Sequence, residues 1–153
     1  MCTLREVLAR HPRFAGAKLL KLDAEGFDCR IIAAEHDWLR RVKPVLFFEY
    51  YPQACQAAGH EPFPVFSLLS RIGYSTLLIY QNIGLFFMAL RLDQSCSIED
   101  LHSFLFDLQG FCDVVAFHKE DEEIAGRVRV NEHVERTRGV IGGERGASNG
   151  QRH

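Results

Sequence analysis

The sequence predicts an α/β fold, and two apolar runs carry this prediction. Residues 19–26 read Leu-Leu-Lys-Leu-Asp-Ala-Glu-Gly, an apolar run that stops at an acid. Residues 45–50 read Val-Leu-Phe-Phe-Glu-Tyr and repeat this design. Such runs are typical of buried parallel strands. A helix-sized segment separates them, so they predict a βαβ unit whose acids share the sheet edge where ligands bind.

The first half of the chain carries clear signals for where its elements begin and end. Thr3 and Glu6 have the spacing of a capping box at a helix start. Asp37 can cap a second helical segment, which predicts a kink near residues 35–36. Pro44 forbids further helix. The expected elements are helix 3–11, strand 18–23, helix 27–42 and strand 45–50.

The second half begins with an irregular loop at 51–64, which holds three prolines. Gly73 suits the left-handed end of a helix. Residues 81–84, Gln-Asn-Ile-Gly, predict a hairpin turn. Ser97 is expected to cap the next helix. The expected elements are helix 65–72, strand 74–80, antiparallel strand 85–92, helix 98–108, strand 113–118 and a last helix from 120 to about 134.

Composition narrows the function classes. The chain has 153 residues, 25% of them charged, and a net charge of −2, which gives no reason to expect a nucleic-acid partner. Its longest apolar stretches are too short to span a membrane, and its first residues lack a signal peptide's apolar core, so a cytoplasmic location is expected. Five scattered cysteines without a CxxC pair indicate reduced thiols, and no ligand spacing indicates a metal.

The domain boundary is expected near residue 135. After Arg136 the chain is poor in apolar residues, with only Val140 and Ile141 among Gly, Ser, Asn and Arg. Segments of this composition cannot bury enough apolar surface to fold. The sequence therefore predicts one domain at 1–135 and a disordered basic tail at 136–153.

Taken together, these stretches resemble the FkbM-type S-adenosylmethionine-dependent methyltransferases. Residues 19–28 look like the family motif "LLKiDvEGxE", and residues 43–50 look like "rPvilfE". Thr3-Leu4 resembles the "TLD" that follows the third strand of that fold, and residues 80–84 resemble a "YDNFG" turn. The likeness spans roughly residues 3–125. It departs at Arg5 and Gln81, where members carry acids.

The resemblance implies a partial Rossmann-like class I methyltransferase sheet with flanking helices. It would hold the fourth to seventh strands, in spatial order 4-5-7-6, with the last strand antiparallel. The glycine-rich turn that cradles the cofactor in the family's first half is not expected in residues 1–135. The implied reaction is methyl transfer from S-adenosylmethionine to a hydroxyl of a sugar or polyketide-like small-molecule acceptor.

Six residues are candidates for the site. By the resemblance and their places at strand ends, Asp23, Glu25 and Glu49 are the expected catalytic acids, and Asp23 would also contact the cofactor. The expected acceptor-binding residues are Tyr50, Tyr51 and Asn82. Each also has an ordinary interpretation, as a strand end, helix cap, core aromatic or turn residue. His60 and His118 are weaker candidates for bases.

Two other functions stay open. The chain could be a non-catalytic fragment or subunit that another chain completes, or an unrelated nucleotide-binding α/β module. In the first case strand 18–23 has an unpaired outer edge, and unpaired apolar edges favour association. The sequence therefore predicts self-association, or a partner chain, at this edge.

Overall fold

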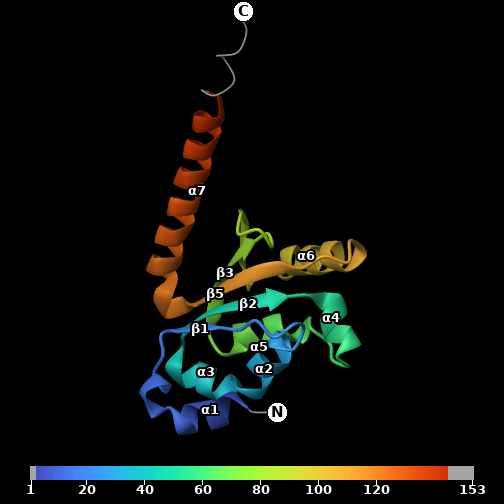
Figure 1. The fold of residues 1–153 in the computed structure, drawn as a ribbon, viewed down its shortest axis with the longest axis vertical. Helices are drawn as coiled ribbons and strands as arrows, with labels where there is room; N and C mark the ends of the chain where they lie inside the picture. Colours follow the sequence, from blue (N-terminus) through green and yellow to red (C-terminus); the bar gives the residue numbers. More distant parts are fainter. Residues whose placement is uncertain (1–2, 145–153) are drawn as a thin grey trace, which may run out of the picture.

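The computed structural model describes residues 3–144, and its centre is one five-stranded mixed sheet (Figure 1). The strand order is β1-β2-β5-β3-β4, with β1 and β2 parallel and each later neighbour antiparallel. The strands are β1 (Leu19–Lys21), β2 (Val45–Tyr50), β3 (Tyr74–Tyr80), β4 (Phe86–Arg91) and β5 (Cys112–His118). The expected order of four strands, with the last one inserted antiparallel, is confirmed, and β4 extends the sheet at one edge.

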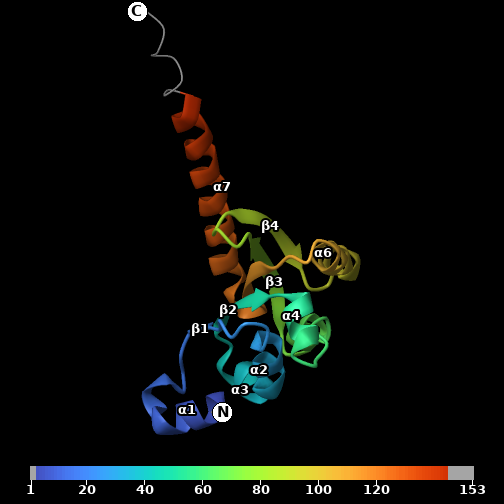
Figure 2. The same cartoon turned by 45° about the vertical axis from the view of Figure 1, so that its right-hand side comes forward.

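One face of the sheet forms the main core. Alternate residues of β2, namely Leu46, Phe48 and Tyr50, are buried on this face, as the pleat of a strand requires. The helices that contribute to this core are α2 (Asp28–Ala34), α3 (His36–Val42), α4 (Pro52–Ala57), α5 (Pro64–Arg71) and α6 (Ser95–Asp107). Figures 1 and 2 show α2 and α3 on this side, with α1 (Leu4–Arg10) beyond them.

The opposite face packs against the first part of α7 (Glu122–Glu144), which then extends away from the body (Figure 2). Leu78, Phe117 and Ala125 form a second, smaller apolar cluster there. Tyr80 Oη donates a hydrogen bond to Glu132 Oε1 at 2.9 Å and ties β3 to the helix. Among the described residues, Leu19 and Phe47 belong to neither apolar cluster. The part of this face around β1 and Phe47 is therefore not packed against α7.

Several local predictions are confirmed. Thr3 accepts a hydrogen bond from the Glu6 amide while Glu6 accepts one from the Thr3 amide, which is the predicted capping box. The predicted kink is a break at Glu35, where α2 ends and α3 begins. Gly73 adopts φ +98° after α5, and Gly84 adopts φ +79° in the hairpin turn.

Other predictions need correction. The β1 strand is shorter than 18–23, because the chain turns away from β2 after Leu22, whose amide donates a hydrogen bond to Phe47 O. The loop after β2 contains the short helix α4, begun by Pro52 in the first helical position. Ser97 lies inside α6, which starts at Ser95 and has no side-chain cap.

The end of the chain also differs from the prediction. The 3-10 turn Lys119–Asp121 leads into α7, which continues past Val134 to Glu144 and so crosses the boundary expected at residue 135. The remainder of the predicted tail, residues 145–153, lies outside the described residues.

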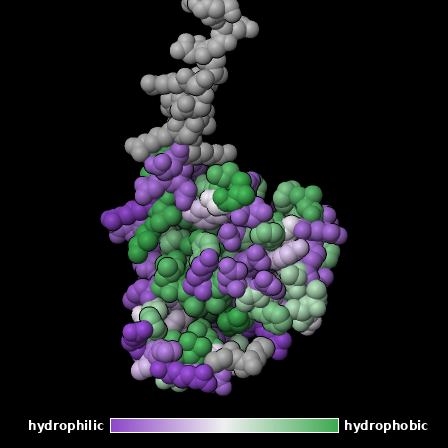
Figure 3. Space-filling view, viewed as in Figure 1, coloured by the Kyte–Doolittle hydropathy of each residue, from purple (hydrophilic) through white to green (hydrophobic). Residues whose placement is uncertain are grey.

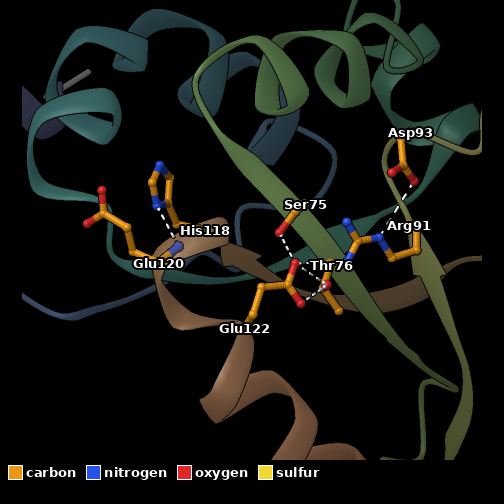
Figure 4. Close-up of polar contacts among 7 residues, drawn as sticks. All are labelled: Ser75, Thr76, Arg91, Asp93, His118, Glu120 and Glu122. Carbon is orange, nitrogen blue, oxygen red and sulfur yellow. Dashed lines mark hydrogen bonds and ion pairs between the residues drawn. The ribbon is translucent and has the colours of Figure 1, made fainter.

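The first turn of α7 is fixed to the sheet by a polar cluster (Figure 4). Ser75 and Thr76 donate hydrogen bonds to the Glu122 carboxylate, and Arg91 pairs with it at 2.9 Å. These groups provide the hydrogen-bond donors that the Glu122 carboxylate needs. They keep its pKa below the ordinary value, and the hydrogen bond from Ser75 has the largest effect. The cluster is a structural junction at the amino ends of β3 and α7. In the described part of the chain, no helix combines the length and apolar character needed to cross a membrane.

Candidate functional site

The carboxyl ends of β1, β2 and β3 meet at one edge of the sheet, where antiparallel β5 begins. Glu49 on β2 lies directly opposite Asp113 on β5, and Asp113 lies opposite Tyr80 on β3. Asp23 follows the end of β1 at the same edge. The fold therefore brings together acids from three neighbouring strands, which we call the carboxylate row (Asp23, Glu49 and Asp113).

Two acids of the carboxylate row, Glu49 and Asp113, have raised pKa values. Partial burial, followed by the charges of Asp28, Asp23, Asp113 and Glu25, raises the pKa of Glu49 above its ordinary value. Burial likewise raises the pKa of Asp113, although nearby Lys21 opposes the shift. A carboxylate with a raised pKa holds a proton more readily and is better matched to base chemistry near neutral pH.

Lys21 supplies positive charge beside the row. Its Nζ lies 3.8 Å from Asp23 Oδ2 and 5.3 Å from the centre of the Phe47 ring. Both partners of the ion pair are well exposed, with 70% of the Asp23 side chain accessible, so water screens the pair. Asp23 is thus available to a ligand at this edge.

Asp28, to which the sequence pattern gave no role, is the most deeply buried acid of the edge. Its side chain is 0% exposed, and Oδ2 accepts a hydrogen bond from the Ala24 amide at 3.1 Å. Oδ1 is buried without a hydrogen-bond partner in the described part of the chain. Burial raises its pKa despite opposing hydrogen bonds from backbone amides. The sequence signal that could have identified Asp28 was its position two residues after Gly26 in the 19–28 motif.

The loop between β1 and α2 has a left-handed backbone conformation, and Gly26 in the sequence had indicated a tight turn there. Glu25 and Gly26 both adopt positive φ, at 47° and 93°. A Cβ on Gly26 would lie 2.8 Å from Ala54 of α4, so only glycine fits there. Glu25 is exposed, and it contributes to the electrostatics of Glu49.

A cavity of about 340 Å³ opens at the same edge, between the ends of β2 and β3 and helix α6. It brings together Tyr51 and Asn82, two of the predicted acceptor-binding residues, with Tyr80 and Gln81. The rest of the lining is mostly aromatic or aliphatic and comes from β4, α6, the loop after it and the start of β5: Phe87, Leu101, Phe104, Leu105, Gln109, Gly110, Phe111 and Cys112. Figure 3 shows apolar surface near the hairpin and α6. We call this the aromatic cavity.

Tyr50 is not part of the aromatic cavity. The strand pleat turns its ring into the main core, where it is 0% exposed and lies 4.7 Å from the Phe66 ring. Its hydroxyl is 2.7 Å from His102 Nδ1, and burial raises the tyrosine pKa while lowering that of His102. The alternation along β2 that buries Tyr50 leaves Glu49 on the other face, so one strand cannot present both to one ligand.

The two candidate histidines lie away from the carboxylate row. His118 ends β5 at the opposite edge, where its Nδ1 accepts a hydrogen bond from the Glu120 amide (Figure 4). Burial lowers its pKa. His60 lies in the loop after α4, with its ring 6.0 Å from that of Phe27. Among the described residues, no three His, Cys, Asp or Glu side chains are arranged to hold a metal ion.

No protein-family model, curated protein or solved structure matches this chain.

Proposed function

We propose that this chain supplies the acceptor side of an S-adenosylmethionine-dependent O-methyltransferase. The observation that carries the proposal is that the carboxylate row and the aromatic cavity lie at the same edge of the sheet, with none of the three acids among the residues that line the cavity. The FkbM-type motifs and the strand order support it as well. The proposed acceptor is a small molecule that presents a hydroxyl group to Glu49.

The chain's own residues account for the acceptor half of such a reaction. Glu49 would take the proton of the acceptor hydroxyl, because its raised pKa suits it to hold that proton. Tyr51 and Asn82 would orient the acceptor within the cavity. The aromatic lining favours an acceptor with an apolar body, such as a polyketide-like compound, over a bare sugar.

The described residues fit the cofactor only in part. An apolar cavity of about 540 Å³, lined by Leu4, Leu22, Phe27 and Ile31 among others, lies beside the loop that follows β1. Asp23 and Glu25 are the exposed acids of that loop. S-adenosylmethionine would supply the methyl group, but the described residues contain no glycine-rich strand-to-helix turn to hold its methionine end. We therefore expect this chain alone to bind S-adenosylmethionine weakly or not at all.

Two measurements test the proposal. Hydroxylated aromatic acceptors titrated into the purified chain should shift the backbone NMR resonances of Tyr51, Asn82 and Phe111, and shifts confined elsewhere would mean that the acceptor site is misplaced. Calorimetry with S-adenosylmethionine should show no micromolar binding. An in-frame glycine-rich strand–turn–helix encoded before Met1 would supply the turn that holds the methionine end of the cofactor.

In a protein completed in this way, labelled-methyl transfer tests the acids. Asp23→Ala and Glu49→Ala should each reduce transfer far more than they reduce thermal stability. Full activity in both variants would show that the carboxylate row is not the reacting edge. Ser103→Ala, an exposed change in α6 outside the cavity lining, serves as the control.

A second candidate function is a non-catalytic subunit that a partner chain completes. The observation that favours it is the outer edge of β1, which has no strand neighbour among residues 3–144 and lies beside the 540 Å³ apolar cavity. A partner strand added there would pair with the β1 backbone and cover the cavity. For either function we propose a cytoplasmic location, because the four described cysteines are free thiols, as expected in a reducing compartment.

A further inference from the structure

A separate cavity of about 350 Å³ lies on the helical side of the molecule, between α2, α5 and the loop before α5. None of its lining residues belongs to the aromatic cavity, while Arg30 also lines the 540 Å³ cavity beside the loop after β1. Ala33, Pro64, Val65 and Leu68 give it an apolar wall. Its volume lies at the small end of the range of small-molecule sites, which is about 300–1,000 Å³.

Two arginines border this cavity from different helices. Arg30 comes from α2 and Arg71 from the last turn of α5, and both are exposed. Neither arginine side chain makes a hydrogen bond or an ion pair with any other residue that the structure describes. Glu61 also lines the cavity and is not within ion-pair distance of either arginine, so their charges are available to a ligand.

His60 adds an unmet hydrogen-bonding group to the same cavity. Both ring nitrogens are buried and have no hydrogen-bond partner among the described residues. The histidine is held in place by its amide, which donates to Cys55 O at 3.1 Å, and by contact with the Phe27 ring. Buried polar atoms are rarely left unpaired, so this imidazole can pair with a ligand atom or with water in the cavity.

We propose that this cavity binds a small organic anion whose oxyanion is held by Arg30 and Arg71. Guanidinium groups match the planar fork of carboxylate and phosphate oxygens. The ligand's oxygen accepts a hydrogen bond from His60, and its apolar body packs against Val65 and Leu68. The ligand class is therefore an aromatic or aliphatic carboxylate or phosphate monoester, and the site is independent of the carboxylate row.

The test is a titration of the full chain with four probes, followed by calorimetry and by backbone NMR of α2 and α5. The probes are phenyl phosphate, benzoate, inorganic phosphate and benzyl alcohol. We expect phenyl phosphate or benzoate to bind more tightly than either inorganic phosphate or the neutral alcohol, and the tighter of the two identifies the oxyanion. Because the site is partly exposed, added salt should weaken this binding.

Matched variants decide between a built site and general charge attraction. Arg30→Gln and Arg71→Gln should each weaken the tighter probe by about tenfold. Arg41→Gln removes the same charge from an exposed position on α3 and should leave binding unchanged. Equal binding by all three variants, or benzyl alcohol binding as well as the anions, would overturn the proposal. Far-ultraviolet circular dichroism confirms that each variant is folded, and none of these readouts depends on S-adenosylmethionine.

Discussion

Glu49 and Asp113 lie directly opposite each other on neighbouring antiparallel strands. Like charges in opposed positions destabilise a sheet. Burial is the main reason that both carboxylates have raised pKa values, and Asp113 also contributes to the shift of Glu49. A neutral side chain at either position would make the folded state more stable. Such a loss of stability is common at functional sites.

The first prediction follows from the raised pKa of Glu49. As pH rises, the unfolded chain ionises this group before the folded chain does, so the free energy of unfolding falls between the two pKa values. Glu49→Gln lacks this penalty and should raise the melting temperature by a few degrees at neutral pH. The gain should vanish in acid, below the ordinary glutamate pKa, where both states of the wild type are protonated. Thermal melts from pH 3 to pH 8 check this, and a gain that is constant with pH would contradict it.

The second prediction concerns the buried acid at the start of α2. Asp28→Ala leaves the Ala24 amide without its acceptor inside the loop and should lower the free energy of unfolding by about 1–3 kcal/mol. Asp28→Asn keeps an acceptor oxygen of the same shape and should cost less. Urea denaturation of the two variants makes the comparison. Equal losses would show that the hydrogen bond to Ala24 is not what Asp28 provides.

The third prediction concerns the glycine after α5. Gly73 has φ +98°, and a Cβ there would clash with His118 Nε2. Gly73→Ala should therefore be destabilised by both backbone strain and overlap, by roughly 2 kcal/mol or more. Gly59→Ala is the matched control, because Gly59 also has positive φ but has open space around it. The melting temperature should fall further for Gly73→Ala than for Gly59→Ala.

The fourth prediction concerns the outer edge of β1. Leu19 is 62% exposed there, and the strand has no neighbour on that side among the described residues. We expect the purified chain to self-associate, and Leu19→Lys to suppress this by placing a charge on the edge. Leu20 is unsuited to the test, because it packs against the main core.

Sedimentation velocity at several concentrations measures this association. Leu108→Lys is the control, since Leu108 is 64% exposed at the far end of α6. Association that survives Leu19→Lys but is lost in Leu108→Lys would show that the contact lies on the surface near α6 and not at the β1 edge. A wild-type chain that stays monomeric throughout would show that the β1 edge does not associate.

Sequence reasoning located most of the elements because their signals are local. The capping box at Thr3, the break at Glu35 and the turn at residues 81–84 each depend on neighbouring residues alone. Elements whose formation depends on tertiary contacts were less predictable from the sequence. The α4 helix forms within a stretch that reads as a loop, and its Cys55 is fully buried in the main core. Propensity alone gave no sign of this burial.

The candidate site was predictable in part for the same reason. The strand-end rule placed Asp23, Glu49 and Asn82 at one edge, and the sheet order confirms that shared edge. The rule could not reveal Asp113, which enters the row only because β5 runs in the opposite direction between β2 and β3. It also suggested Tyr50 as a contact, although the alternation that exposes Glu49 buries its neighbour.

The central place of β5 has a consequence for how the protein is made. Both β2 and β3 need this strand as a neighbour, yet it lies after both of them in the chain. While the ribosome is still synthesising residues before Cys112, the nascent chain can hold only two separate pieces of sheet, each with an open apolar edge. The core can close only when His118 has emerged from the exit tunnel. Slow translation or a stop before that point would leave both pieces exposed to aggregation and to the chaperones that bind such chains.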